Sequence, residues 1–495
     1  MRLSQPVPFP LPLLARLAAL TLAACNLGHA QPRTSLSLDE AIRLALDRNA
    51  QIKVEAFTPM IARAELLAAR GQFDPALTFR RSYSENGAPE TAGIPSLVKT
   101  DDYSLAFEGT TPWGMNYSLG GSAFNERIAR TGYADRFATF GGIRVTQPLL
   151  RGFGFGANLL GLRIAKAERG IADWQFRQTV IDTVTNVMIA YSDVAFAQQR
   201  LRIAQRSREL AAGLLAENEK RFRVGGMSEN DVTQARARTA TRDDFILFAD
   251  QAVRDAINRL RLLIGETDFP IDPGTLVVEP PPVDDTKTAN AAEDLKLAYD
   301  NRPDFQQARL GLRKREATRA AARNQLLPQV DFVGSYGYHG LDRDFGVSRR
   351  EVRDHENRSY SAGVVVSVPL TFAEGRGRAR SAKLQLLQAE TDLERLKQEI
   401  AVRIASAAGQ LETTRLRVAA NRAAYDLAKQ ALDAEIKRLR AGTSNTFFVL
   451  NLQGELIGAE NSYYNSLADQ RRAHANYDRE LGRTLAVHNI TLEKQ

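Results

Sequence analysis

The chain has 495 residues, of which 44% are hydrophobic and 25% are charged, and its formal net charge is +8. These ordinary fractions suit either one extended domain or two to three conventional domains. The basic residues are spread along the chain and form no block interleaved with aromatic side chains, which argues against a nucleic-acid-binding protein and indicates solvated helix faces.

The N-terminus has the pattern of an export signal. Arg2 and Arg16 precede an apolar run at residues 17–24. This run is too short to span a bilayer but has the length of a secretory signal core.

Two processing sites fit this signal, and the sequence leaves both open. Residues 22–25 resemble a bacterial lipobox, in which Cys25 would be acylated, whereas residues 28–30 fit ordinary cleavage of a signal at residues 1–30. Cys25 is the only cysteine. The mature chain therefore has no disulfide and must be held together by packing and assembly.

The first elements expected after the signal are two helices. Ser37 can cap a helix that begins near residue 38, with Glu40 three residues later in the capping-box position. A second helix is expected over residues 50–70, with a kink or break at Pro59. Residues 73–75, Phe-Asp-Pro, end it.

Between residues 76 and 150 the apolar period changes to two, which predicts four β-strands. No apolar run after the signal reaches the roughly 18 residues of a transmembrane helix, so we expect these strands to carry any membrane crossing. A soluble β-sandwich has the same alternation and stays an alternative. The alternating apolar residues are Leu77, Phe79, Tyr103, Leu105, Phe107, Met115, Tyr117, Leu119, Ile143 and Val145, with a turn at residues 111–114.

A proline-free stretch between Pro148 and Pro270 predicts a very long helical hairpin at about residues 156–265. Its first helix, expected over residues 158–222, would be a rod of roughly 100 Å at about 1.5 Å per residue. The return helix is expected to begin near Ser228, whose hydroxyl can cap it. A narrow coiled-coil seam is formed by Ile181, Val184, Met188, Tyr191 and Ala195.

The chain then repeats this order of elements, so we divide it into a first repeat, residues 31–288, and a second repeat, residues 289–485. The expected layout is a proline-rich linker at 265–288, helices at 292–328, strands at about 330–370, a second long hairpin at about 378–485 and a tail at 486–495. The inward stripe of the second hairpin is Leu393, Leu396, Ile400, Ile404, Ala407 and Leu411.

The spacing of matching residues locates an insertion in the first repeat. Pairs in front of the strands are 253 residues apart, as in Asp47 and Asp300, whereas pairs at the hairpin tips are 217 apart, as in Gly225 and Gly442. The first repeat therefore holds 36 more residues. We expect them to form an additional β-hairpin at about residues 100–125.

Each long hairpin reverses through a short run of small residues, in which glycine supplies the positive φ that a helix end needs. We call these runs the first tip and the second tip. The first tip is Val224, Gly225, Gly226, Met227 and Ser228, and the second tip is Ala441, Gly442, Thr443 and Ser444. Small side chains let another chain approach the backbone, which suits a docking surface, but an efficient helix reversal has the same composition.

Three segments carry a resemblance to a known family: residues 38–49, residues 146–152 and residues 223–232. Together with the two rounds of strands and long hairpins, they resemble the TolC-like outer membrane efflux protein family over nearly the whole mature chain. The resemblance implies a mainly α fold with a transmembrane β-barrel part. In a homotrimer, the strands would share one barrel in the outer membrane of a Gram-negative bacterium, and the helical hairpins would form a periplasmic tunnel.

The resemblance also implies a function. The chain would be the outer-membrane channel of a tripartite efflux or type I secretion system, embedded in outer-membrane lipid. It would receive substrate from an inner-membrane transporter through a periplasmic adaptor protein, and the two tips would be the adaptor-docking sites. No cofactor, metal site or nucleic acid is expected.

Two departures from the family pattern concern the pore. Some members narrow the tunnel entrance with aspartates just after the second tip, whereas Phe448 and Asn451 stand at the matching places here, beside Phe447. We expect an apolar constriction in place of an anionic ring, unless both rings pack between helices. Members usually give two strands per repeat, but the first repeat here offers four, so either the barrel is larger or one hairpin lies outside it.

An enzyme has little support in the sequence. The histidines His339, His355, His474 and His488 are isolated, and the glycine-rich residues 152–156 have no βαβ unit around them, so we interpret that run as a strand-to-helix joint. The remaining alternative is a periplasmic coiled-coil scaffold or adaptor protein without a pore. An adaptor needs one compact β domain, whereas two separated strand sets favour a barrel wall.

Overall fold

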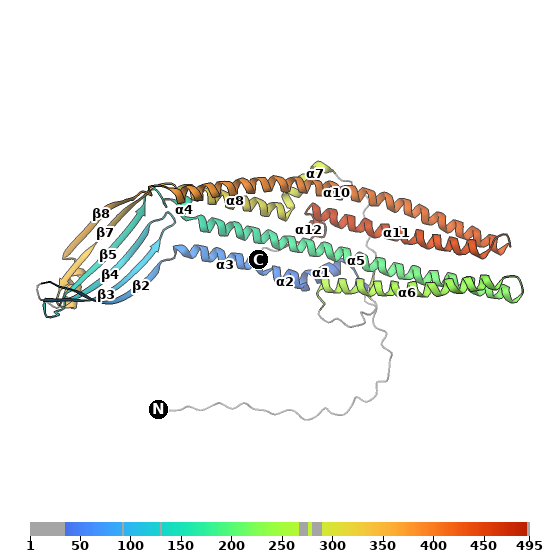
Figure 1. Ribbon diagram of the computed structural model, residues 1–495, viewed down its shortest axis with the longest axis horizontal. Coiled ribbons are helices and arrows are strands. Elements are labelled where there is room, and N and C mark those ends of the chain that lie inside the picture. Colours follow the sequence, from blue (N-terminus) through green and yellow to red (C-terminus); the bar gives the residue numbers. More distant parts are fainter. Residues whose placement is uncertain (1–34, 92–93, 129–130, 267–275, 280–289, 493–495) are drawn as a thin grey trace, which may run out of the picture.

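The computed structural model describes residues 35–91, 94–128, 131–266, 276–279 and 290–492. The expected signal sequence, Cys25 and most of the proline-rich linker lie outside these residues. The described chain is long and narrow (Figure 1): a β-sheet forms one end, and long helices run from it to two helical tips at the other end.

Six antiparallel strands form one continuous sheet in the order β2-β3-β4-β5-β7-β8. Four of them precede the first long hairpin and two precede the second, as the sequence predicts. Their bounds are β2 (Ala76–Thr91), β3 (Ile94–Thr110), β4 (Asn116–Ile128), β5 (Phe137–Pro148), β7 (Gln329–Asp342) and β8 (Asn357–Ser367). The turn between β3 and β4 is where it was predicted, since Thr111 N donates a hydrogen bond to Met115 O at 2.8 Å.

The two faces of this sheet differ in polarity. One row of directly paired residues crosses all six strands and is apolar: Leu77, Phe107, Leu119, Ile143, Tyr336 and Tyr360. Its side chains are between 40% and 72% exposed. The adjacent row, on the opposite face, consists of Thr78, Ala106, Gly120, Gly142, Gly337 and Ser359. An exposed apolar face with a small, polar face behind it suits a wall between lipid and water.

Three helices lead from the N-terminal side to the sheet: α1 (Leu38–Arg48), α2 (Ala50–Glu55) and α3 (Phe57–Arg70). Ser37 caps α1 as predicted, because its Oγ accepts a hydrogen bond from Glu40 N at 3.2 Å. The predicted helix over residues 50–70 is divided, but at Ala56 rather than at Pro59. Pro59 is buried in the first turn of α3, where proline is tolerated because the first N–H groups of a helix have no intrahelical partner.

The first long hairpin consists of α5 (Leu160–Arg223) and α6 (Glu229–Ile264), after the short α4 (Phe155–Asn158). The 64 residues of α5 form a rod about 96 Å long. Its predicted seam is buried: Ile181, Val184, Tyr191 and Ala195 are at most 3% exposed, and Met188 packs against the same core.

The second round consists of α7 (Ala291–Asn301), α8 (Pro303–Asn324), strands β7 and β8, and a long hairpin of α10 (Ala373–Arg440) and α11 (Thr446–Glu480), followed by α12 (Thr484–Val487). Ile400, Ile404 and Leu411 of the predicted inward stripe are buried, and the other three residues pack against them. Two short strands, β1 (Ser35–Leu36) and β6 (Val277–Val278), form a parallel pair beside α5. The division of the chain into two repeats stays our interpretation.

One element was not predicted. A nine-residue helix, α9 (Phe345–Arg353), lies between β7 and β8 and packs on β5 and β7. Its Ser348 is fully buried, and the hydroxyl donates a hydrogen bond to Phe137 O at 3.2 Å and lies 2.8 Å from Thr139 Oγ1. The helix is therefore anchored to the sheet by these polar contacts, together with the ring contact between Phe345 and Phe137 at 5.6 Å.

The long helices form a single curved layer with two open edges. In the half nearer the sheet, which we call the upper half, neighbouring helices follow the order α10-α8-α5-α3. In the half nearer the tips, the lower half, the order is α10-α11-α5-α6. The edge strands continue the same edges, since α3 leads into β2 and β8 leads into α10 (Figure 1). One edge of the described chain is therefore β2, α3 and α6, and the other is β8 and α10.

Among the described residues, only α5 contains an 18-residue window that is long and apolar enough to cross a membrane. The sequence expectation concerned uninterrupted apolar runs, and α5 contains no such run of 18 residues. Within the protein, 67% of this window is buried, against α1 and α6 among others. The window belongs to the core of the helical layer.

Candidate functional site

The first tip closes α5 with a left-handed glycine. Gly225 has a φ of 79°, its N donates a hydrogen bond to Phe222 O at 2.9 Å, and Gly226 N donates to Arg221 O at 2.9 Å. These bonds satisfy carbonyl groups that a helix end leaves free. Ser228 then starts α6 with a capping box, because its Oγ accepts from Asp231 N and the Asp231 carboxylate accepts from Ser228 N. The predicted Ser228 cap is confirmed.

The second tip repeats this geometry at the end of α10. Gly442 has a φ of 76°, its N donates to Leu439 O at 3.1 Å, and Thr443 N donates to Arg438 O at 3.0 Å. Asn445 caps α11 by accepting a hydrogen bond from Phe448 N at 3.3 Å. The two tips are thus built in the same way from different sequences.

The two tips lie side by side and share a small core. Arg221 Nη1 approaches Leu439 O at 3.5 Å, and Thr446 Oγ1 lies 4.0 Å from Met227 Sδ. The core beneath them contains Leu214, Leu432, Leu439, Val449 and Leu450. Both tips therefore belong to one end surface and not to two separate ones (Figure 1).

Both tip glycines face open space. A Cβ atom built on Gly225 or Gly442 would have no neighbour within 4 Å, and the adjacent Val224 is 82% exposed. Within a single chain, the positive φ is therefore the only obstacle to replacing either glycine with a larger residue. Their surroundings leave room for another molecule to approach the backbone.

The predicted entrance residues follow the second tip on the outward side of α11. Phe447 is 63% exposed and Phe448 is 53% exposed, and their rings meet edge to face at 5.8 Å. Asn451 Nδ2 donates to Glu455 Oε1 at 3.2 Å, one turn further on. Within one chain, neither ring packs between helices.

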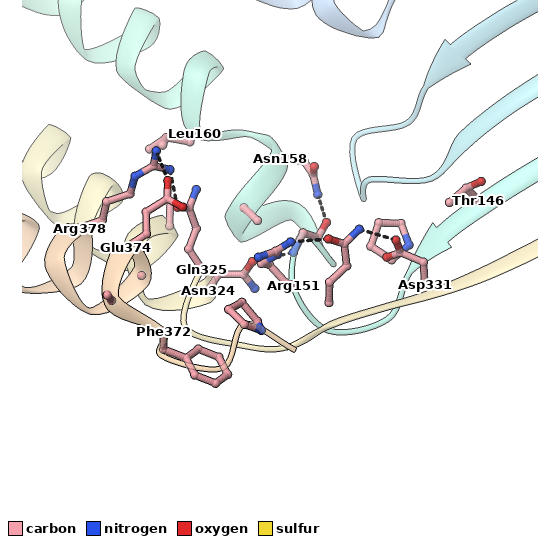
Figure 2. Close-up of a pocket in the computed structure, with 18 of the residues that line it drawn as sticks. Thr146, Arg151, Asn158, Leu160, Asn324, Gln325, Asp331, Phe372, Glu374 and Arg378 are labelled. Carbon is pink, nitrogen blue, oxygen red and sulfur yellow. Dashed lines mark hydrogen bonds and ion pairs between the residues drawn. The ribbon is translucent and has the colours of Figure 1, made fainter. Parts of the chain in front are cut away.

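Sequence reasoning missed a polar cavity of about 750 Å³ where the sheet meets the helices. Figure 2 shows that its walls come from the ends of β5 and β7 and from the ends of α8 and α10. Arg151 donates to Gln329, whose Nε2 donates to Asp331 Oδ2 at 2.6 Å, while Asp331 Oδ1 has no hydrogen-bond partner. These residues come from distant segments, so no local motif marks the cavity.

The same joint is tied to the helices by further polar contacts (Figure 2). Gly152 N donates to Asn324 Oδ1 at 2.7 Å, which connects the predicted strand-to-helix joint with the end of α8. At the start of α10, Arg378 Nη1 donates a hydrogen bond to Oε1 of Gln325, the C-cap of α8, at 3.0 Å. These hydrogen bonds connect the loop after β5 and the start of α10 to the end of α8.

Buried carboxyl groups in the lower half of the helical layer include Glu435 and Glu460. Glu460 of α11 is 9% exposed, and this burial raises the pKa of its carboxyl, although Arg206 and Lys429 partly offset the effect. Among the described residues, no group of three or more His, Cys, Asp or Glu side chains could hold a metal ion.

Comparison with known proteins agrees with this architecture. The sequence profile of the family described as "Outer membrane efflux protein" matches residues 41–266 and 295–483. The structure is similar to that of the outer-membrane channel OprN, with a TM-score of 0.67 and 19% identity over 90% of this chain and 89% of that one. At this identity the likeness shows the fold.

Two curated relatives are matched in sequence. Outer membrane efflux protein BepC of Brucella suis is 27% identical over 64% of this chain and 66% of its own length. Cobalt-zinc-cadmium resistance protein CzcC of Cupriavidus metallidurans is 26% identical over 61% of this chain and 68% of its own length. These alignments span about two thirds of each relative. The chain belongs to the outer membrane efflux protein family, whose members are channels of the Gram-negative outer membrane and not enzymes.

Proposed function

We propose that three copies of this chain assemble edge to edge into one channel, which carries substrates from the periplasmic side through the outer membrane to the exterior. The observation that carries this proposal is the pair of open edges described above. A closed ring of copies would place the β8 and α10 edge of one chain against the β2, α3 and α6 edge of the next.

The side chains on both edges support such a closure. Exposed apolar residues on the α2, α3 and α6 side are Val54, Phe57, Ile61, Leu67, Phe245, Leu247, Phe248 and Leu262, and those on α10 are Leu384, Leu387, Val402, Leu416 and Leu427. Monomeric soluble proteins rarely expose large contiguous apolar patches, because contact of apolar surface with water is unfavourable. Burial between copies would remove both patches at once.

Closure is also required by the sheet. Strands cannot enter lipid with unpaired N–H and C=O groups, and in the described residues β2 pairs only with β3 and β8 only with β7. Pairing β8 of one copy with β2 of the next would leave no edge. The apolar row would then face lipid and the row of small residues would face the lumen.

The tips suit docking of a periplasmic adaptor protein that connects the channel to an inner-membrane transporter. In this proposal Val224, Gly225, Gly226, Met227 and Ser228 of the first tip, with Ala441, Gly442, Thr443 and Ser444 of the second tip, form the docking surface. Its support is the shared end surface, the open space beside both glycines and the exposure of Val224.

The entrance of the tunnel lies next to this surface. We propose that Phe447, Phe448 and Asn451 from each copy narrow it, since both rings are more than half exposed within one chain. Three such sets around one axis would form an apolar constriction without fixed charge.

The test is assembly followed by conduction. Protein extracted from membranes should require detergent, elute as a trimer and open ion-conducting channels in planar bilayers. Release by osmotic shock as a soluble monomer that never conducts would exclude the channel and favour a periplasmic scaffold.

A further inference from the structure

We infer that the additional hairpin, β3 and β4, is part of the barrel wall, so that each chain supplies six strands and three copies close a barrel of 18 strands. The inference rests on the proposed assembly of three copies. The observation behind it is that four strands lie between α3 and α5, whereas two strands lie between α8 and α10.

The hairpin is hydrogen-bonded into the sheet on both of its sides. β3 pairs with β2 from Glu108 opposite Ala76 to Ser96 opposite Ala88, and β4 pairs with β5 from Asn116 to Asn125. A hairpin folded away from the wall would leave β2 and β5 to pair directly, as β7 and β8 do. Instead, two full strands separate them.

The faces of the hairpin agree with those of the wall. Phe107 and Leu119 lie directly opposite each other in the apolar row, between Leu77 of β2 and Ile143 of β5. Behind them, Ala106 pairs with Gly120 in the row of small residues. Because side chains alternate along a strand, this register gives the hairpin one lipid-facing side and one water-facing side, like every other strand of the sheet.

The width of the helical layer supports the same count. Four helices stand side by side in each half of the layer, α10, α8, α5 and α3 in the upper half, and at about 9 Å per helix they cover about 36 Å of circumference. Six strands spaced about 4.8 Å apart and tilted by about 40° cover about 38 Å, whereas four would cover only about 25 Å. Six strands therefore continue the tunnel wall without narrowing.

The consequence is a wide outlet. Because barrel diameter grows roughly in proportion to strand number, 18 strands give a barrel about 1.5 times as wide as 12 strands would. The outlet would then pass any substrate that the tunnel admits, and selection by size would fall to the entrance.

The first experiment removes the hairpin. Deleting residues 94–128 leaves β2 and β5 joined by residues 92–93 and 129–136, and because Leu77 and Ile143 already lie in one row, the two strands can pair without exchanging faces. Electron cryomicroscopy of both trimers in nanodiscs should show 18 strands in the wild type and a barrel about two thirds as wide in the deletion variant. A wild-type wall of four strands per chain, or equal diameters, would overturn the inference.

The second experiment keeps the full chain, in case the deletion variant does not fold. Neither processing route at Cys25 leaves a free thiol, so single cysteines can be placed on a clean background. Leu119→Cys should react with a membrane-soluble maleimide and resist a water-soluble one, whereas Ser122→Cys, on the opposite face of β4, should react with the water-soluble reagent. Ile143→Cys on β5 is the matched control.

Labelling of Leu119→Cys by the water-soluble reagent, while Ile143→Cys stays protected, would show that the hairpin lies outside the wall. This result would leave the proposed channel standing. A wild-type protein that neither trimerises nor conducts would instead remove the channel itself, so the two failures are distinguishable.

Discussion

Arg302 Nη1 donates a hydrogen bond to Glu480 Oε2 at 2.5 Å and so connects the start of α8 with the end of α11. The guanidinium also binds Asp304 through two parallel bonds of 3.0 and 2.7 Å. Only 7% of the Arg302 side chain and 14% of the Glu480 side chain are exposed. This ion pair connects α8 to α11, where the upper and lower halves of the helical layer meet.

Arg302→Ala should destabilise the protein by about 3 kcal/mol, because it removes the better-buried partner of the largely buried Glu480 carboxylate and leaves it only the more exposed Arg479 at 3.4 Å. The matched control is Arg415→Ala, which breaks an exposed pair with Glu412 whose side chains are 52% and 56% exposed, and which should cost less than about 1 kcal/mol. Denaturant unfolding of the purified protein measures both. Equal effects of the two substitutions would contradict the assigned role of the Arg302 pair.

Gly225→Asn and Gly442→Asn test the tips as docking surfaces. Asparagine tolerates a positive φ better than other side chains, and no atom of the chain lies within 4 Å of a Cβ built at either position. Both variants should therefore keep the trimer and its conductance in planar bilayers but lose at least tenfold in export by cells. Gly132→Asn, also at a left-handed glycine with open surroundings but at the opposite end, should export normally. Normal export by both tip variants would remove the docking assignment.

Phe448→Asp tests the apolar entrance. Three copies of the variant would place three carboxylates around the axis, and divalent cations should then reduce the single-channel current. Phe448→Asn introduces a side chain of the size of aspartate but without charge. The single-channel current of this variant should stay insensitive to divalent cations, as in the wild type. A current in Phe448→Asp that added cations do not change would place Phe448 away from the conduction path.

Glu460→Gln tests the cost of one buried carboxylate in the lower helical layer. Burial raises the pKa of Glu460 in the folded protein, so the folded state holds this proton more tightly than the unfolded state does. The stability gained from the protonated form is therefore present below the unfolded pKa of about 4.3 and is lost as pH rises through the folded pKa. Thermal unfolding should show Glu460→Gln more stable than wild type at pH 8, with a smaller difference at pH 4. An equal difference at both values would contradict this account.

The sequence was sufficient to predict the elements whose apolar side chains recur regularly over many residues. The coiled-coil seam around Tyr191 and the absence of proline predicted α5 and α6 nearly to the residue. The spacing of matching residues predicted an additional hairpin at about residues 100–125, and β3 and β4 occupy residues 94–128. The tips could be predicted because a helix reversal needs glycine at a fixed place.

Other features could not be read from local patterns. α9 has no apolar stripe long enough to signal a helix, and it is held by Ser348 against Thr139, more than 200 residues away in the chain. The cavity beside Asp331 likewise depends on four separated segments meeting. The break before α3 was misplaced because Pro59 lies in a first turn, where its missing N–H does no harm.

The unpaired edges of β2 and β8, with the exposed apolar side chains of the edge helices, make a single chain prone to aggregation before it assembles. Such surfaces bind one another indiscriminately, so isolated copies in the periplasm risk clumping. In the proposed trimer, completion of the fold and encounter of the three copies would have to be closely timed, and a holding chaperone that shields β2 and β8 would extend the time available for correct encounter.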